Sequence, residues 1–234
     1  MQRLDKLLSE AGVASRKDLK AMIRAGRVSV DGRTVTSPET KVDETCARVC
    51  VDGQEIGKRR TVVLMLHKPA GFVTSTDDPR DKTVMELIPA AYRSMELKPV
   101  GRLDKDTEGL LLLTNDGALA HRILSPRHSV WKRYYAKHEG QAGPADVEAF
   151  AQGILLKDGD QCLPARLLPQ GPGRSIVEVR EGKYHQVRRM LASRGMPVTY
   201  LKRISEGGLE LGDLPLGQTR EIPAEAAEQA LFPE

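Results

Sequence analysis

The spacing of apolar positions in the first part of the chain predicts two short helices followed by a hairpin. The first helix is expected over residues 3–10, and the second begins after Ser15, which is placed to cap it. Gly26 is positioned to end the second helix. Two alternating runs around an Asp-Gly turn then predict a hairpin over residues 27–35. The apolar stripes are Leu4, Leu7 and Leu8 in the first helix and Leu19, Met22 and Ile23 in the second.

After residue 60 the apolar positions gather in longer runs, which are typical of buried strands. The expected strands and helices do not alternate regularly along the chain. This order favours an α+β fold, with a mostly antiparallel or mixed sheet flanked by helices, over a doubly wound fold. The expected strands are 62–66, 109–114, 133–138 and 175–180, and the expected helices are 117–124, 145–152 and 184–194.

The stretch between these two patterns reads as a linker, because residues 52–60 contain two glycines and end in Lys58-Arg59-Arg60. The sequence therefore predicts a small N-terminal domain over residues 1–57, the end of a linker at 58–60 and a larger domain over 61–234. A chain of this length can bury a core without disulfides or metals.

Apolar runs and cysteines indicate the compartment. The longest apolar runs, 62–66 and 110–113, are far too short to cross a bilayer, and the charged N-terminus lacks the apolar segment of a signal peptide. The cysteines Cys46, Cys50 and Cys162 cannot all pair, and their spacing does not match a zinc site. We expect reduced thiols in a cytoplasmic, monomeric protein that does not associate with membranes.

Charge is distributed unevenly along a chain whose net charge is +4. Residues 1–60 contain 13 Lys/Arg against 9 Asp/Glu, residues 121–203 contain 15 against 7, and residues 204–234 reverse to 1 against 7. Two basic regions and an acidic tail fit a polyanionic partner better than a small-molecule substrate. On charge alone, basicity that serves only solubility remains an alternative.

The most informative segment is a polar loop over residues 101–108 that runs into an apolar strand. Such a loop can hold Asp104 firmly while leaving it accessible. The residues by themselves also allow a solvated acidic loop, part of a cation site, or a glycosidase pair of Asp104 and Asp106, although two residues so close in sequence are poorly placed to flank a bond. Because the chain contains no Gly-rich phosphate loop, dinucleotide fingerprint or His/Cys cluster, we expect no metal and no organic cofactor.

The opening RLDKLLSEAGVASRKDLKAMIRAGRVSVDG resembles the S4-type RNA-binding domain nearly throughout. The resemblance implies a rigid two-helix surface that presents Lys and Arg to RNA phosphates, which supply affinity and position. The residues implied in this role are Arg3, Lys6, Arg16, Lys17, Lys20, Arg24 and Arg27.

Four further blocks occur in order: Leu66-His67-Lys68-Pro69-Ala70-Gly71, then GRLDKDTEGLLLLTNDG over 101–117, then Lys132-Arg133-Tyr134, and finally EGKYHQVRRM over 181–190. Together with the S4-like opening, this set resembles the RsuA-type pseudouridine synthases, and the second block resembles their catalytic-loop signature. One departure is His67, where the family commonly has Asn. We expect this difference to alter packing or a local hydrogen bond rather than to abolish a reaction.

The resemblance implies roles for individual residues. Asp104 is implied as a nucleophile that attacks the ribose or, in an older proposal, the uracil ring. Arg188 matches the basic residue that pairs with this Asp, and helical spacing places it on one face with Tyr184. Tyr134 matches the tyrosine that stacks on the target uracil, although its neighbour Tyr135 leaves open which of the two faces the site.

Other matches concern contact with RNA. Arg102 matches the arginine that fills the gap left when the uridine leaves its helix, a step that is needed because stacking hides the reacting atoms. His185 and Gln186 are expected to orient the start of a helix and to line the pocket. The further residues implied in RNA binding are Lys68, Tyr184, His185 and Gln186.

The implied activity is the isomerisation of uridine to pseudouridine in ribosomal RNA. Segments 74–79 and 121–128 resemble the small-subunit branch of the family, which implies 16S rRNA or an assembling small-subunit particle as the partner. The alternatives are a 23S rRNA enzyme of the same family and a non-catalytic S4-type RNA-binding protein.

Overall fold

The computed structural model describes residues 1–43, 46–57, 60–125 and 127–233. The chain divides into two compact units, Met1–Arg60 and Thr61–Glu234, each of which is considered by itself. Lys58 and Arg59 of the predicted linker lie outside the described residues. Within the described ranges, no helix has the length and apolar character that a membrane crossing requires.

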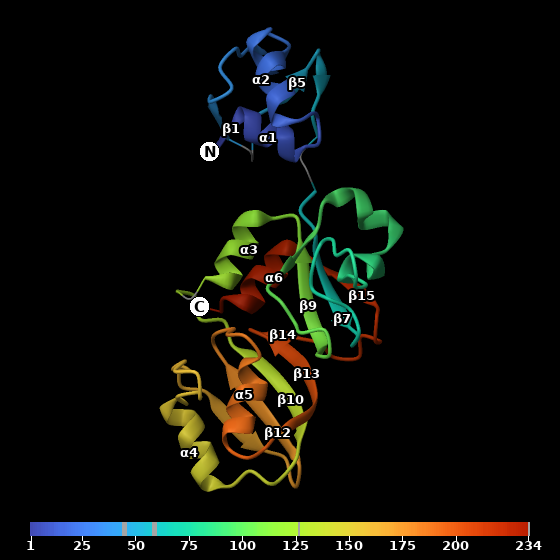
Figure 1. Cartoon of the computed structure of the whole chain (residues 1–234). Helices are drawn as coiled ribbons and strands as arrows, with labels where there is room; N and C mark the ends of the chain where they lie inside the picture. Colours follow the sequence, from blue (N-terminus) through green and yellow to red (C-terminus); the bar gives the residue numbers. More distant parts are fainter. Residues whose placement is uncertain (44–45, 58–59, 126, 234) are drawn as a thin grey trace. The chain divides into compact units, whose positions relative to one another are not determined.

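The first unit contains the two helices and the hairpin predicted from the sequence (Figure 1). Helix α1 spans Leu4–Glu10, and helix α2 spans Arg16–Arg24. Ser15 caps α2, because its Oγ accepts a hydrogen bond from the Asp18 backbone N–H at 3.3 Å. Strand β1 (Gln2–Arg3) pairs with β4 (Lys41–Val42), and a second sheet has the order β3-β2-β5-β6, formed by Arg33–Thr34, Val28–Val30, Val49–Val51 and Gln54–Glu55.

The core of this unit is formed by the apolar stripes of both helices. Leu4, Leu8, Leu19 and Ile23 are fully buried against Val28 and its neighbours in the sheet. Each such side chain contributes about 1.5–3 kcal/mol through removal of its apolar surface from water. Because the stripes point inwards, the Lys and Arg positions between them face solvent, whereas Asp5 is buried and pairs with Arg3.

The second unit is built on one mixed sheet with the strand order β11-β12-β10-β13-β9-β7-β15. Two short strands lie off this path: β8 pairs with β9, and β14 pairs with β13. Strands β9 and β13 run parallel, whereas the other pairings described for this sheet are antiparallel. The strands are β7 (Val63–Lys68), β8 (Lys98–Val100), β9 (Glu108–Thr114), β10 (Lys132–His138), β11 (Arg166–Pro169), β12 (Arg174–Val179), β13 (Val198–Glu206), β14 (Leu209–Glu210) and β15 (Thr219–Ile222).

Helices cover different parts of the two sheet faces (Figure 1). Alternate residues of β7 and β9 belong to two apolar clusters, and one of these clusters includes the inner residues of α3 (Gly117–Leu124) and α6 (Ala224–Leu231). The other cluster includes residues of α4 (Pro144–Gln152) and α5 (Gln186–Ser193), which pack against β10, β11, β12 and β13. The short 3₁₀ helices Val84–Leu87 and Ala90–Met95 also join this second cluster.

The predicted α+β class is confirmed, and each predicted strand and helix of the second unit corresponds to an element of the structure. The helix expected over 184–194 is shorter, because His185 has a left-handed backbone (φ 46°) and α5 begins only at Gln186. Tyr184 therefore precedes the helix and does not share a helical face with Arg188, which corrects the prediction from spacing. Strands β8, β11, β13, β14 and β15 and helix α6 were not predicted.

Candidate active site

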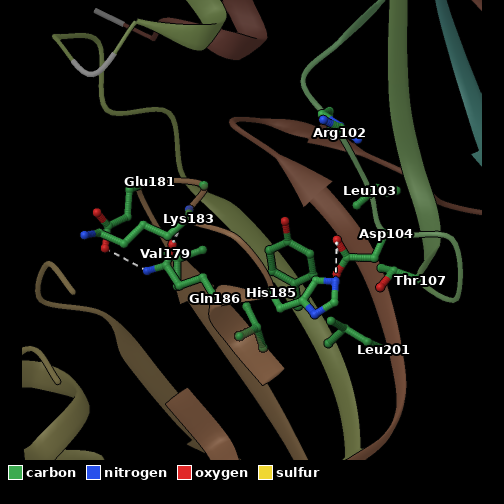
Figure 2. A pocket seen from close by; sticks show the side chains of 13 residues that line it. Arg102, Leu103, Asp104, Thr107, Val179, Glu181, Lys183, His185, Gln186 and Leu201 are labelled. Carbon is green, nitrogen blue, oxygen red and sulfur yellow. Dashed lines mark hydrogen bonds and ion pairs between the residues drawn. The ribbon is translucent and has the colours of Figure 1, made fainter. Parts of the chain in front are cut away.

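A small pocket of about 60 Å³ opens between the loop that precedes β9, strands β10, β12 and β13, and the start of α5. Asp104 enters it from the loop, Tyr134 from β10 and His185 from the residue before α5. The pocket thus gathers residues from three of the four sequence blocks that the sequence analysis singled out. Figure 2 shows Asp104 and His185 facing one another across it, with Arg102 further along the same loop.

The loop that carries Asp104 is held from two sides. On one side, the Thr74 hydroxyl donates to the Leu103 carbonyl at 2.8 Å and accepts from the Leu103 N–H at 3.1 Å. The Leu103 side chain is buried in the apolar cluster below. The Thr107 N–H donates to the Asp104 carbonyl at 3.0 Å and closes a turn. The backbone of the loop is therefore fixed, while the Asp104 carboxylate points into the pocket.

Lys68 holds the other side of this loop. Its side chain is fully buried, and its Nζ donates to the carbonyls of Pro69, Asp104, Lys105 and Thr107 at 2.8–3.3 Å. Burial lowers the pKa of Lys68 to about 8, although nearby carboxylates oppose this effect. A fully buried ammonium group cannot reach RNA, so the predicted RNA-binding role of Lys68 is corrected: it positions the loop that carries Asp104.

The Asp104 carboxylate is partly exposed and lightly restrained. His185 Nε2 lies 3.5 Å from Asp104 Oδ1, and the Asp104 side chain is 30% exposed. The His185 ring stacks on the Tyr184 ring, with centroids 3.9 Å apart and planes at 17°. Tyr184 itself is 75% exposed. This arrangement leaves the carboxylate oxygens available to a reacting group.

Arg188 forms an ion pair with a different carboxylate from the one predicted. Its Nη2 is 2.9 Å from Asp106 Oδ2, and its Nη1 donates to the Val198 carbonyl at 3.5 Å. The turn that Thr107 closes places Asp106 toward α5, where Arg188 is located. In the structure Arg188 therefore fixes the loop through Asp106, and its predicted direct pairing with Asp104 is not observed. The Arg188 Nε is buried without a hydrogen-bond partner among the described residues.

Tyr134, and not Tyr135, faces the pocket. Tyr134 is buried with the apolar residues under α4 and α5, whereas Tyr135 lies on the opposite face of β10 and packs edge-on against Tyr200, with ring centroids 6.3 Å apart. Burial raises the pKa of Tyr134 and outweighs the opposing charge of Arg203. The hydroxyl therefore stays protonated at neutral pH, and a stacking role for the ring requires no ionisation.

A buried charged group next to Tyr134 escaped the sequence analysis. Arg203 lies opposite Tyr134 in the sheet, and its Nη2 is 3.5 Å from Glu206 Oε2, with both side chains at most 2% exposed. Arg203 Nε donates to the Leu110 carbonyl at 2.7 Å. The backbone of Gly109 passes so close that a Cβ there would lie 2.1 Å from the Arg203 carbonyl oxygen. The glycine of the catalytic-loop block is thus required by contact with β13.

The segment before α5 is fixed by a polar network. Gln186 is buried; its Oε1 accepts the Lys183 N–H at 3.1 Å and its Nε2 donates to Glu181 Oε1 at 2.7 Å (Figure 2). Glu181 Oε1 also accepts the Leu163 N–H at 2.8 Å. This arrangement agrees with the expectation that Gln186 orients the helix start and lines the pocket. Its role in RNA binding stays a prediction.

His67 replaces the Asn that is common in the resembling family, and it makes a local hydrogen bond. Its Nδ1 lies 2.7 Å from the Leu214 carbonyl oxygen. Because burial lowers the pKa of His67, the ring is neutral and Nδ1 is the donor. His67 thus ties the end of β7 to the turn before β15.

The remaining predicted RNA-contacting residues are exposed. Arg102 lines the pocket margin and forms no ion pair with the described residues. In the first unit, Arg3 pairs with Asp5 at 2.9 Å, and Arg27 pairs with Asp52 at 2.5 Å. Arg16, Lys17, Lys20 and Arg24 project from α2 into solvent.

Comparison with known proteins gives consistent matches. The family model described as RNA pseudouridylate synthase matches residues 62–193, and the S4 domain model matches residues 2–45. An uncharacterized RNA pseudouridine synthase of Bacillus subtilis (strain 168) is 40% identical over 228 residues, covering 95% of each chain. The ribosomal small subunit pseudouridine synthase A of Vibrio parahaemolyticus is 40% identical over 214 residues, covering 90% of this chain and 91% of the relative.

A solved structure agrees with these sequence matches. A crystal structure of a pseudouridylate synthase superimposes with a TM-score of 0.70 at 31% sequence identity, covering 98% of this chain and 100% of the other. The matched family model spans the pocket residues Asp104 and Tyr134, and also Arg188. The chain therefore belongs to the RNA pseudouridine synthase family, in its RsuA-like branch with an S4 domain, and is an RNA-modifying isomerase.

Proposed function

We propose that this enzyme isomerises one uridine of 16S ribosomal RNA to pseudouridine, with Asp104 as the nucleophile. The proposal rests on a difference in hydrogen bonding between the two carboxylates that line the pocket, those of Asp104 and Glu181. Glu181 accepts two hydrogen bonds, whereas the Asp104 carboxylate is restrained only by the 3.5 Å contact with His185 among the described residues. A nucleophile needs unshared, accessible electron pairs at a fixed position, and Asp104 supplies them.

The reaction breaks one bond and forms another without loss of atoms. When Asp104 attacks C1′ of the ribose, an ester bond forms between the carboxylate and C1′ as the C1′–N1 bond breaks, and the uracil is released within the pocket. The base then turns and its C5 attacks C1′, which breaks the ester bond and frees the Asp104 carboxylate. The C5 proton leaves and N1 gains a proton, so the product is an isomer of the substrate. Attack on the uracil ring is the alternative first step, and both routes require the same carboxylate. The isomerisation is redox-neutral.

Two residues are proposed to bind the flipped uracil and to fill the space it leaves in the RNA helix. The Tyr134 ring, at the floor of the pocket, stacks on the uracil; a stack of this kind is worth about 1–3 kcal/mol and tolerates rotation of the base. Arg102, at the exposed margin, fills the gap in the RNA helix after the uridine leaves. Unstacking costs a few kcal/mol, so a residue that occupies the vacated space lowers the cost of flipping.

The choice of 16S rRNA rests on similarity. A relative that is 40% identical is named for the small ribosomal subunit. The segments 74–79 and 121–128 resemble that branch as well; Pro126 within the second segment lies outside the described residues. Thr74, in the first of these segments, has a structural role, because its hydroxyl holds the Asp104 loop by a hydrogen bond to the Leu103 carbonyl. A 23S rRNA target is the competing assignment within the family.

Asp104→Asn tests the chemistry. The amide is nearly isosteric but has no nucleophilic charge, so release of tritium from 5-labelled uridine in a 16S transcript should fall below about a tenth of the wild-type rate while RNA affinity is retained. Asp213→Asn, at a 90% exposed side chain, is the matched control. Activity of Asp104→Asn above that level would place the nucleophile elsewhere.

Chemical mapping of pseudouridine in rRNA from cells with and without the gene tests the target. Loss of one 16S pseudouridine is the expected result. Loss of a 23S site would move the assignment to the large subunit. An unchanged pattern, together with an inactive purified enzyme, would favour a non-catalytic S4-type RNA-binding protein.

A further inference from the structure

The half of the sheet formed by β10, β11, β12 and β13 has a second face that no helix described above covers. Ala136 and Val177 belong to the apolar cluster under α4 and α5, which lie on one side of these strands (Figure 1). Because successive side chains of a strand alternate, Tyr135 and Lys137 point to the other side. Register places Ile176 and Arg174 of β12 opposite them on that side.

We call this second side the open sheet face. Its members are joined by contacts that do not involve the pocket: Lys137 Nζ lies 5.4 Å from the Tyr200 ring centroid, and two guanidinium groups, those of Arg166 and Arg180, lie 4.6 and 4.8 Å from the centroid of Trp131. The open sheet face consists of Trp131, Arg133, Tyr135, Lys137, Arg166, Leu168, Arg174, Ile176, Glu178, Arg180, Tyr200 and Lys202, with Glu108 at its edge.

The charge of this face is strongly positive. It presents six Lys/Arg against two carboxylates, Glu178 and Glu108. Glu178 is shared by Arg133 and Arg166, and Glu108 accepts a hydrogen bond from the Tyr200 hydroxyl at 2.7 Å. Among the described residues, the other four cations form no ion pair; these are Lys137, Arg174, Arg180 and Lys202.

One pairing on this face is unfavourable for the fold. Lys137 and Arg174 are directly opposite in the antiparallel ladder, and both are exposed. Like charges in this position destabilise a sheet, by analogy with the 0.2–1 kcal/mol that opposite charges contribute. Stability alone does not account for the pair, whereas an anionic ligand placed over both would remove the repulsion.

From this arrangement we propose that the open sheet face binds the phosphate backbone of a second segment of the RNA substrate, remote from the segment that enters the pocket. The aromatic rings orient the cations by cation–π contact and leave their N–H groups free for phosphates. The proposal rests on the proposed function only in taking 16S rRNA as the ligand. Its consequence is that a long, folded transcript binds more tightly than a short stem–loop containing the same uridine.

The test compares Lys137→Glu/Arg174→Glu with a charge-matched control, Lys98→Glu/Lys157→Glu, at exposed lysines outside this face. The ligands are a folded 16S transcript and a short stem–loop that contains the modified uridine. For the long transcript we expect the double variant to weaken the Kd roughly tenfold and to lower the log–log salt slope by roughly 1.4–1.8, at 0.7–0.9 per lost phosphate contact. Binding of the stem–loop and the saturated single-turnover rate should match the control.

Thermal unfolding distinguishes a loss of RNA contacts from a folding defect in the variants. Arg174→Glu alone replaces a repulsive pair with an attractive one, so its Tm should equal or exceed the wild-type value while its affinity for the long transcript falls. Equal Kd and salt slope in the double variant and the control would overturn the proposal, and would be expected if the face serves an acidic protein instead. A fall in the saturated rate with unchanged affinity would also overturn it. These outcomes are independent of whether Asp104→Asn is inactive.

Discussion

The Arg188 guanidinium contacts Asp106 at 2.9 Å, two residues along the loop from the carboxylate that lines the pocket. Arg188 is largely buried, with its side chain 19% exposed, whereas Asp106 is 68% exposed. An ion pair as exposed as this contributes little to stability, about 0–1 kcal/mol. The contact matters for geometry, because it fixes the far side of the turn that presents Asp104, while Arg188 does not pair with Asp104 itself.

A double-mutant cycle on this pair is the first prediction. If Arg188 acts through Asp106, Arg188→Ala and Asp106→Asn should each lower the saturated single-turnover rate, and the double variant should be no slower than the worse single one. The coupling energy should lie in the range of about 0.5–3 kcal/mol for residues in contact. Arg188→Lys should retain partial activity because it keeps the charge but loses the planar fork. A slow Arg188→Ala beside a normal Asp106→Asn would instead indicate that Arg188 moves to Asp104 when RNA binds.

The second prediction concerns pH and Lys68. Its ammonium group serves four carbonyls in the folded chain, and its pKa is lowered to about 8 from 10.5. As pH rises through 8, the neutral amine loses a donor, the loop loosens and the saturated rate should fall. Lys68→Met should be about tenfold to a hundredfold slower at pH 7, since a shift of the loop by about 1 Å is costly to catalysis.

Stability should follow the opposite trend. The unfolded chain retains the Lys68 proton up to about pH 10.5, whereas the folded chain releases it near pH 8, so this residue's contribution to stability rises with pH between those values. Denaturant melts of wild type and Lys68→Met at pH 7, 8, 9 and 10 would measure it as a difference between the two. Lys98→Met, at an exposed lysine of β8, is the control. An alkaline loss of activity centred well away from pH 8 would contradict the assignment.

The third prediction concerns α2. Replacing Arg16, Lys20 and Arg24, which follow one another at i, i+4 and i+8 on its exposed side, with Gln should weaken RNA binding without changing the saturated rate. If all three contact phosphates, the log–log salt slope should fall by roughly 2–3, at 0.7–0.9 per contact. Circular dichroism of the variant checks that α2 remains folded. An unchanged slope would mean that this side of α2 does not touch the RNA.

The fourth prediction concerns Gly109. A Cβ at this position would lie 2.1 Å from the Arg203 carbonyl oxygen, and the backbone has φ 114°, so Gly109→Ala should lose about 1–3 kcal/mol or more of unfolding free energy. Gly117→Ala, where nothing lies within 4 Å at the start of α3, should be neutral or stabilising by up to about 1 kcal/mol. Equal melting temperatures for the two variants would show that β9 and β13 separate more readily than the structure implies.

Local signals in the sequence were sufficient for much of the fold. The stripe Leu19, Met22 and Ile23, with Ser15 before it, predicts α2, and the apolar run 109–114 predicts β9. Strand β13 escaped prediction because its buried positions include Arg203, Ser205 and Glu206, which break the alternation of apolar and polar residues. In a sequence pattern, the charged residues of a buried ion pair cannot be distinguished from exposed residues.

The candidate site was predicted to a different degree at each residue. The resemblance of the four blocks to a known family predicts that Asp104 and Tyr134 lie together. The order of motifs along a chain can be recognised without knowing the geometry. The partner of Arg188 could not be predicted from the sequence. Asp104 and Asp106 lie in one turn, and the hydrogen bonds of Thr107 and Lys68 decide which of the two carboxylates faces Arg188. The burial of Lys68 was equally hidden, since a lysine in a loop block ordinarily reads as a surface charge.

The parallel pairing of β9 with β13 has a bearing on how the enzyme matures. Contacts between Gly109 and Arg203 close a loop of more than ninety residues, and contacts so distant in sequence form slowly during folding. A chain emerging from the ribosome could fold its S4 unit and the antiparallel β7–β9 pair early. Tyr134 and Arg188 would reach the Asp104 loop only after β13 is inserted. Catalytic competence is thereby deferred until nearly the whole chain has been synthesised, while affinity for RNA can be acquired from the first sixty residues.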